Sequence, residues 1–368
     1  MRMGRGIPWR HFDFLLLGAI VLATAFGVTM IRSAVAGNEE LLPLVNRQIL
    51  FAVAGLAVIF LVASIDYRYW LALYIPIYAA MMALLIALYL SAQAVFGAAR
   101  WFQVGVFFVQ PTEFSKVVLI VILARYFERT ADRPHDLRWA LNSLGWTMGL
   151  AMWILLQPNL SNVIVLLVLW MAMLWISGLP LKYFFAFGLA GLVAAIAGFP
   201  FLQPYQQQRV INFLFPDPTA RHGATYNVRQ ALIAIGSGGL FGKGYGHGSQ
   251  VQLRFLKVRH TDFIFSATAE EFGMVGALLV VAVLVFIIFR CLRAARLARD
   301  LSGSLIAYGV AVLIFFQAAV NIGVNLNLIP VSGLPLPFIS YGGSGLLSLM
   351  LAIGLVESVV MRQNELEF

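Results

Sequence analysis

Long apolar runs, separated by short polar segments, make up most of the chain. Ten of these runs are long enough to cross a bilayer as helices, since a core of about 30 Å needs about 20 apolar residues. They lack the alternation of apolar and polar positions that membrane β-strands show. The runs cover residues 12–34, 47–64, 68–91, 111–128, 138–156, 160–178, 181–200, 263–290, 302–329 and 337–361. The pattern predicts an all-α polytopic membrane protein with about ten transmembrane helices.

One long polar segment, 201–262, interrupts this pattern between the seventh and eighth runs. Within it, Val228–Ile235 carries apolar residues at helical spacing, which predicts an amphipathic helix on the membrane surface. Seven of the 13 residues in Gly236–Gly248 are glycine, so this stretch must turn sharply or approach another segment closely. We interpret 1–368 as a single membrane domain that contains this loop.

Composition and charge agree with a membrane protein and predict its orientation. The chain is 61% hydrophobic and 11% charged, which excludes an ordinary soluble domain. With the N-terminus inside, the inner segments collect 14 of the 25 Lys and Arg residues. The positive-inside rule then places both termini in the cytoplasm and the 201–262 loop outside. Basic groups split across two membrane faces suit membrane lipids and argue against a nucleic-acid partner.

The long outer loop is itself basic, which suits an anionic ligand such as a phosphate or pyrophosphate. The chain's one cysteine, Cys291, excludes an intrachain disulfide and is interpreted as a small apolar filler.

Asp262 is the first candidate functional residue, because it directly precedes the eighth apolar run. Charged groups at that depth usually serve a substrate, an ion or a proton. Asp262 could act as a general base toward a hydroxyl group, or hold Mg²⁺ against a pyrophosphate. The alternative is an ordinary helix N-cap, a role that aspartate often fills.

Four other charged residues occur within predicted spans, two at the start of the fourth and two inside the eighth. Glu113 and Lys116 are three apart and can pair on one helix face, as a structural ion bridge or as the lining of an outer cavity. Glu270 and Glu271 are adjacent, so at least one should face a cavity or a cation. In the glycine-rich stretch, Lys243 and the backbone N–H groups could bind a phosphate, or the stretch could simply be a connection rich in turns.

Polar residues also mark the last two spans. Gln317, Asn321 and Asn325 are spaced four apart and predict a stripe that hydrogen-bonds to neighbouring helices. The segment 330–345 contains three prolines and several glycines, which predicts an irregular start to the last span.

Five segments, in this order, resemble motifs of the SEDS family, the polytopic peptidoglycan glycosyltransferases related to RodA and FtsW. They are Gly97–Trp101, Gln110–Lys116, Ala234–Gly244, His260–Gly273 and Pro335–Gly343. The short tails and Gly248–Leu253 look more like RodA than FtsW. One motif departs from the family: the usual Q-P-D-x-G-T reads Gln157-Pro158-Asn159-Leu160-Ser161-Asn162 here.

The resemblance implies a lipid II polymerase at the outer face of the bacterial cytoplasmic membrane, acting in cell elongation and rod shape. Lipid II is a disaccharide-pentapeptide on undecaprenyl pyrophosphate, and the family's essential loop aspartate falls on Asp262. The implied partner is a class B penicillin-binding protein. Two other functions stay open at this point, a lipid II flippase and a non-catalytic scaffold.

The resemblance and the charge pattern together give a predicted site with Asp262 as the catalytic base. Eight further residues are predicted to bind substrate: Arg100, Glu113, Lys116, Lys243, Arg259, His260, Glu270 and Glu271. No organic cofactor is expected. A divalent cation, Mg²⁺ or Mn²⁺, is compatible with the pyrophosphate, but its ligands are not identified, and Asn159 replaces the acid that the family carries.

Overall fold

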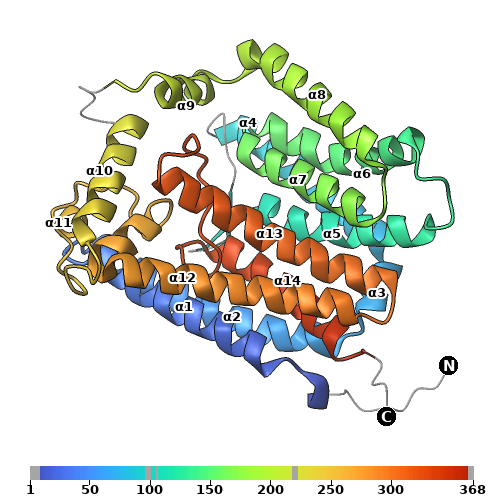
Figure 1. Ribbon diagram of the computed structural model, residues 1–368, viewed down its shortest axis with the longest axis horizontal. Coiled ribbons are helices and arrows are strands. Elements are labelled where there is room, and N and C mark those ends of the chain that lie inside the picture. The colour runs from blue at the N-terminus through green and yellow to red at the C-terminus, as the bar shows by residue number, and fades with distance from the viewer. Residues whose placement is uncertain (1–8, 96–100, 105–106, 218–222, 364–368) are drawn as a thin grey trace.

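The structure is a computed structural model that describes residues 9–95, 101–104, 107–217 and 223–363. It confirms a mostly helical chain (Figure 1). The long helices are α1 (Phe14–Val35), α2 (Pro43–Ser64), α4 (Tyr74–Val95), α5 (Pro111–Arg129), α6 (Leu137–Leu156), α7 (Leu160–Ile176), α8 (Leu181–Gly198), α12 (Ile264–Leu297), α13 (Leu301–Asn325) and α14 (Gly343–Val360). The short helices are η1 (Trp9–His11), α3 (Tyr67–Ala72), η2 (Phe199–Phe201), α9 (Pro204–Leu214), α10 (Gly223–Gly238) and α11 (Ser249–Gln252).

Each predicted span corresponds to a helix. Within the described ranges, eight helices are long and apolar enough to cross a membrane, so the chain is a multi-pass membrane protein. Helix α7 has 17 residues, and α5 carries charges at both of its ends, including Glu113 and Arg129. The total of ten spans therefore stays a prediction.

Several boundaries differ from the prediction, including the end of α12, which lies at Leu297 instead of 290. The third run is divided near Leu73 into α3 and α4. A short hairpin of β1 (Phe102–Val104) and β2 (Phe107–Val109) follows α4 and was not predicted. The last span begins at Gly343 rather than at 337, because Pro337 has no N–H to donate and Phe338 has a left-handed φ of 63°. The irregular start predicted for this span is confirmed.

Helices α13 and α14 form the centre of the bundle, between α2, α5, α7 and α12 (Figure 1). Helix α8 lies at the periphery and buries none of its residues. A close approach holds the turn before α14 against α1: a Cβ at Gly27 would lie 2.5 Å from the carbonyl oxygen of Ile339. Glycine at this position therefore lets α1 support the 330–342 turn.

The glycine-rich stretch of the loop docks on a kink in α12. Gly273 has φ 68° and ψ −165°, which breaks the helical hydrogen-bond pattern. The loop satisfies the freed groups: the Met274 N–H donates to the Gly239 carbonyl at 2.8 Å, and the Lys243 N–H donates to the Glu270 carbonyl at 3.0 Å. The loop backbone thus completes the interrupted helix.

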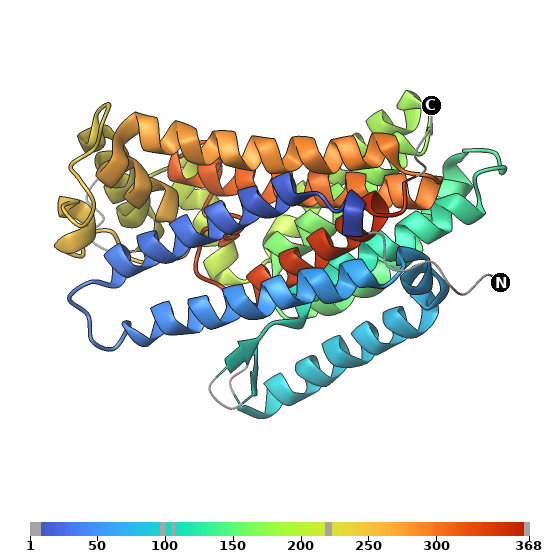
Figure 2. The same ribbon diagram turned by 90° about the horizontal axis from the view of Figure 1, so that it is seen from below.

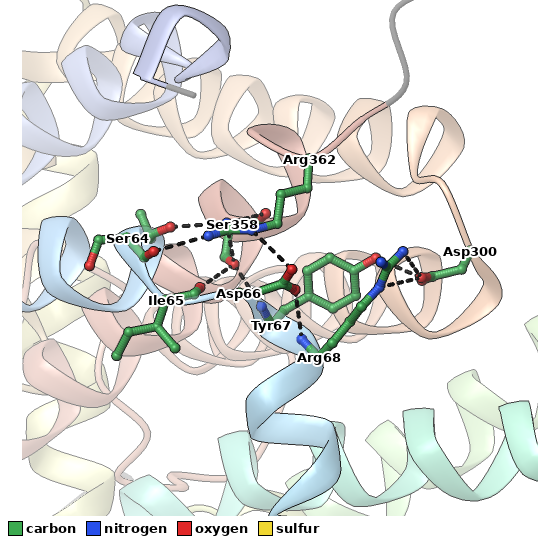
Figure 3. A network of polar contacts seen from close by, with 9 residues as sticks. Ser64, Ile65, Asp66, Tyr67, Arg68, Asp300, Ser358 and Arg362 are labelled. Carbon is green, nitrogen blue, oxygen red and sulfur yellow. Dashed lines mark hydrogen bonds and ion pairs between the residues drawn. The ribbon is translucent and has the colours of Figure 1, made fainter. Parts of the chain in front are cut away.

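The two ends of the bundle differ. Helix η1 and the end of α14 lie at one end, here called the terminal end, and α10 and α11 lie at the other (Figure 2). At the terminal end, the Tyr67 hydroxyl and the Arg68 guanidinium both bind the Asp300 carboxylate, at 2.7 and 2.9 Å (Figure 3). Arg362 Nη1 donates to the Ser358 hydroxyl at 2.9 Å. This network joins α3, α14 and the turn between α12 and α13.

Candidate functional site

A cavity of about 630 Å³ lies where α5, α7 and α12 begin, and α9 and the 330–335 turn complete its wall. Asp262 and Glu113 are on the wall, and Arg209 is the basic side chain among the described lining residues. Ligand sites in proteins usually have volumes of about 300–1,000 Å³. The cavity therefore has the size of a ligand site, and it brings together two acids and one cation from three separate segments.

The main chain of Asp262 is fixed by two asparagines of α13. Asn321 Nδ2 and Asn325 Nδ2 donate to the Asp262 carbonyl oxygen at 3.1 and 2.9 Å. Asn325 Oδ1 in turn accepts the Ser266 N–H at 3.0 Å. The predicted hydrogen bonding of the α13 stripe is thus confirmed for Asn321 and Asn325, whereas Gln317 Oε1 is buried without a partner in the described part of the chain.

The N-cap interpretation of Asp262 is wrong. The N-cap of α12 is Phe263, whose side chain makes no capping hydrogen bond, and the Ser266 N–H of the first turn is bound by Asn325 instead. Within the described part of the chain, the Asp262 carboxylate makes no hydrogen bond or ion pair. The carboxylate is therefore available to a ligand in the cavity.

The surroundings of Asp262 favour its protonated form more than water does. Burial raises the pKa of its carboxyl from the ordinary 3.8 to about 6, although the positive charge of Arg209 acts in the opposite direction. Arg209 is held on α9, where its guanidinium stacks over the Tyr205 ring at 5.6 Å and donates to the Val331 carbonyl at 3.2 Å. At neutral pH, Asp262 is an ionised base with a pKa close to the working range.

Glu113 and Lys116 form the ion pair that their spacing predicts. Lys116 Nζ lies 2.8 Å from both carboxylate oxygens of Glu113. Lys116 is 1% exposed and is absent from the cavity wall, whereas Glu113 is on it. Asn162 Nδ2 lies 3.4 Å from the Thr112 hydroxyl and 3.5 Å from Glu113. The pair therefore presents an already neutralised carboxylate to the cavity.

Lys243, Glu270 and Glu271 lie at the α12 kink and not on the wall of this cavity. Lys243 Nζ contacts Glu270 Oε1 at 2.8 Å, so the expectation that one of the two acids faces a cation is confirmed. Glu271 accepts a hydrogen bond from the Ser33 hydroxyl. The contacts of these three residues fasten the loop to α12 and α1, and a role in substrate binding stays a prediction for them.

Arg259 and His260 are also outside the cavity wall. Arg259 is buried, and its guanidinium donates to the carbonyl oxygens of Ala34 and Leu256. His260 has a pKa below its ordinary value, because of burial and the nearby positive charge of Arg259. Arg100 lies outside the described residues.

Sequence reasoning missed Arg209 as the cation that faces Asp262. It was one of seven basic residues in the loop, and nothing in the loop's charge distribution separated it from the others. The available signal was local: Pro204 begins a helix, and Tyr205 and Arg209 are four apart on one helix face.

The donor set does not fit a divalent cation held by the protein alone. No group of three metal-binding side chains occurs among the described residues. Both oxygens of Glu113 bind Lys116, and the cavity has Asn159 at the position where the family pattern has an acid. Asp262 alone would offer a free carboxylate, so a divalent cation at this site would also need oxygens from a bound pyrophosphate.

Comparison with known proteins identifies the family. A family model described as "Cell cycle protein" (FtsW, RodA, SpoVE) matches residues 9–365. The chain is 34% identical to the probable peptidoglycan glycosyltransferase FtsW of Aliivibrio salmonicida, over 96% of this chain and 87% of that protein. It is also 34% identical to the peptidoglycan glycosyltransferase MrdB of Escherichia coli K12, over 95% and 93% of the two chains.

Solved structures agree with the family model. A chain in a peptidoglycan synthase complex, described as coordinating polymerization and crosslinking, superposes with a TM-score of 0.80 at 30% identity, over 96% of this chain and 99% of that chain. The rod shape determining protein RodA of Thermus thermophilus gives a TM-score of 0.72 at 30% identity, over 97% and 99%. The chain therefore belongs to the FtsW, RodA and SpoVE family, the SEDS family that its motifs resemble.

Proposed function

We propose that the chain is a peptidoglycan glycosyltransferase that polymerises lipid II into glycan strands, with Asp262 as the general base. The observation that carries this proposal is the free carboxylate of Asp262, with a pKa of about 6, on the wall of a cavity of about 630 Å³. Relatives across nearly the full length are named peptidoglycan glycosyltransferases.

In the proposed reaction, Asp262 accepts the proton of the 4-hydroxyl group on the acceptor sugar. The acceptor oxygen then attacks the anomeric carbon of the donor chain and forms the new glycosidic bond. The bond from that carbon to undecaprenyl pyrophosphate breaks, its electron pair leaves with the pyrophosphate, and the anomeric centre inverts. Arg209 stands on the same wall and can stabilise the negative charge of the leaving group.

We also propose that the protein lies in the bacterial cytoplasmic membrane. Both termini face the cytoplasm of a bacterium, and the cavity opens at the outer face of the cytoplasmic membrane. The partner is a class B penicillin-binding protein that crosslinks the product, which suits the similarity to a chain of a peptidoglycan synthase complex. A role in elongation rather than division is proposed from the sequence alone, since FtsW and MrdB relatives are equally similar.

The test is polymerisation of lipid II by the purified chain, with and without a class B partner, followed on a gel. We expect glycan strands from the complex. If the folded complex made none, transport or scaffolding would become the better account. A flippase would instead move lipid II between the leaflets of a vesicle without lengthening it.

The Arg209→Gln variant should shift the pH dependence of polymerisation. Arg209 lowers the pKa of Asp262, so its removal raises that pKa above about 6 and moves the rise in activity to higher pH. Loss of charge stabilisation should also reduce the maximal rate by about tenfold to a hundredfold. The control is Lys257→Gln, an exposed loop cation that does not line the cavity. If the pH midpoint of polymerisation were unchanged in Arg209→Gln, Arg209 would not influence the pKa of Asp262.

Replacing Asn325 by Ala should damage both fold and activity. The change removes a donor to the Asp262 carbonyl and the acceptor of the Ser266 N–H. The Ser266 N–H, left without its acceptor, costs about 1–3 kcal/mol, so the melting temperature should fall. The rate should fall further at a temperature where the variant is fully folded, because Asp262 keeps only one of its two contacts with α13. Full activity at that temperature would show that Asn325 only stabilises.

A further inference from the structure

A second cavity, of about 410 Å³, lies at the terminal end of the bundle, beside η1 and the end of α14. It is formed by η1 and the start of α1, the last turns of α12 and the residues around the end of α14. Its wall includes the basic residues His11, Arg290 and Arg293. None of the proposed catalytic residues is near it in the sequence or on its wall, so the proposed function does not account for it.

Arg290 is fixed in this wall by an ion pair. Its Nε donates to Asp13 Oδ2 at 2.8 Å, and its side chain is 13% exposed. The other oxygen of Asp13 accepts the Leu16 N–H at 3.0 Å, and the Asp13 N–H donates to Glu357 Oε2 at 3.0 Å. Both carboxylate oxygens of Asp13 therefore already have partners, and Glu357 is completely buried. The guanidinium of Arg290 keeps N–H groups for a further acceptor.

Arg293 supplies a second cation to the same cavity. It follows Arg290 by three residues on α12, so the two side chains share a helix face. Arg293 is exposed and makes no hydrogen bond or ion pair within the described part of the chain. One guanidinium is thus fixed, and the next has no partner among the described residues, an arrangement that matches the oxygens of a phosphate.

An apolar rim borders these cations. Phe14 is 65% exposed, Leu15 63% and Leu297 51%, and all three line the cavity. Trp9 of η1 lies just before them in the chain and is also exposed, and tryptophan is typical of membrane interfaces. A free phosphate ion would gain nothing from this rim, whereas the acyl chains of a lipid would cover it.

We propose that this cavity binds the phosphate headgroup of an anionic phospholipid, with Arg290 and Arg293 on the phosphate and the acyl chains against Phe14, Leu15 and Leu297. Basic pockets between helices on the inner side of a membrane are suited to such headgroups. The bound lipid joins α1 to α12 at the end opposite the catalytic cavity. The site does not depend on the proposed reaction.

The test uses the purified full-length chain in neutral detergent, with phosphatidylglycerol added and lipid occupancy measured by native mass spectrometry. The Arg293→Gln variant should bind phosphatidylglycerol about tenfold more weakly, since one hydrogen bond between charged groups is lost. The matched control is Arg296→Gln, which removes the same charge one turn further along α12 but outside the cavity. In neutral detergent this control should keep wild-type affinity. Both variants should keep the wild-type melting temperature, because both arginines are exposed on the helix surface.

Three results would overturn the proposal. If Arg293→Gln and Arg296→Gln lost equal affinity for phosphatidylglycerol, the lipid would be held only by general attraction to the basic end of α12. If Arg293→Gln bound phosphatidylglycerol as tightly as the wild type, Arg293 would not contact the headgroup. Displacement of the lipid by inorganic phosphate at equal concentration would indicate a site for the free ion, in which the apolar rim has no part. Weak binding of zwitterionic phosphatidylethanolamine by the wild type would support the anionic requirement.

Discussion

The Asp262→Asn variant is expected to lose polymerisation while gaining stability. Asparagine keeps the shape of the side chain but cannot accept the proton of the acceptor hydroxyl. General bases contribute about 10²–10⁴ in rate, so the loss should be at least about a hundredfold. Lipid II binding should change much less, because Asp262 is proposed to act on the proton and not to anchor the substrate.

The expected gain in stability follows from the direction of the pKa shift. The pKa of Asp262 is raised from 3.8 to about 6 in the folded protein. The free energy of unfolding that Asp262 contributes is therefore fully present below about pH 4 and is lost as the pH rises through about 6. At pH 7 the ionised carboxylate costs up to roughly 3 kcal/mol, which the neutral amide does not. The melting temperature of Asp262→Asn at pH 7 should exceed that of the wild type.

The matched control for this variant is Asp217→Asn, which removes the other acid of the same loop. Asp217 lies outside the cavity that Asp262 lines, on the wall of a separate pocket between α9 and α10. Polymerisation should persist in this control. If Asp262→Asn polymerised lipid II at the wild-type rate, or if both variants lost equal activity, Asp262 would not be the general base.

The Glu113→Gln variant is expected to unfold at a much lower temperature than the wild type. The change leaves the ammonium group of Lys116, which is 1% exposed, without its carboxylate partner. Removing one member of a buried ion pair typically costs about 3–5 kcal/mol, because the other charge stays buried and uncompensated. Thermal unfolding in detergent measures the effect.

The double variant Glu113→Gln with Lys116→Met separates this cost from a loss of shape. Replacing both members of a buried pair by neutral groups is often close to neutral in stability, so much of the lost melting temperature should return. If the double variant were as unstable as Glu113→Gln, the damage would come from packing and not from the unpaired charge. Activity of the double variant then reports whether the cavity needs the pair for substrate as well as for folding.

Most of the fold could be predicted from the sequence, because long apolar runs determine the helices. Start and end errors were small where a run met a clear polar boundary, as at Ile264. They were larger at the last span, where Pro337 and the left-handed Phe338 delay the helix. The hairpin at Phe102–Val109 gave no signal of its own, because its residues are as apolar as the spans around it.

Individual residues of the site could be predicted from the sequence, but their arrangement in space could not. Spacing within one helix was sufficient for the pair of Glu113 and Lys116. It could not show that Lys243 folds back onto Glu270, which lies 27 residues away, since that contact depends on the kink at Gly273. Nor could it place Arg209 near Asp262, because long-range packing and not sequence spacing brings α9 to the cavity.

The pH dependence of lipid II polymerisation by the wild-type complex tests the central claim most directly. Measured in single turnover, so that product release does not interfere, the rate should rise about tenfold per pH unit at acidic pH and level off above about 6, where Asp262 is ionised. A rate that stays constant between about pH 4.5 and 8 in the folded complex would contradict Asp262 as the general base.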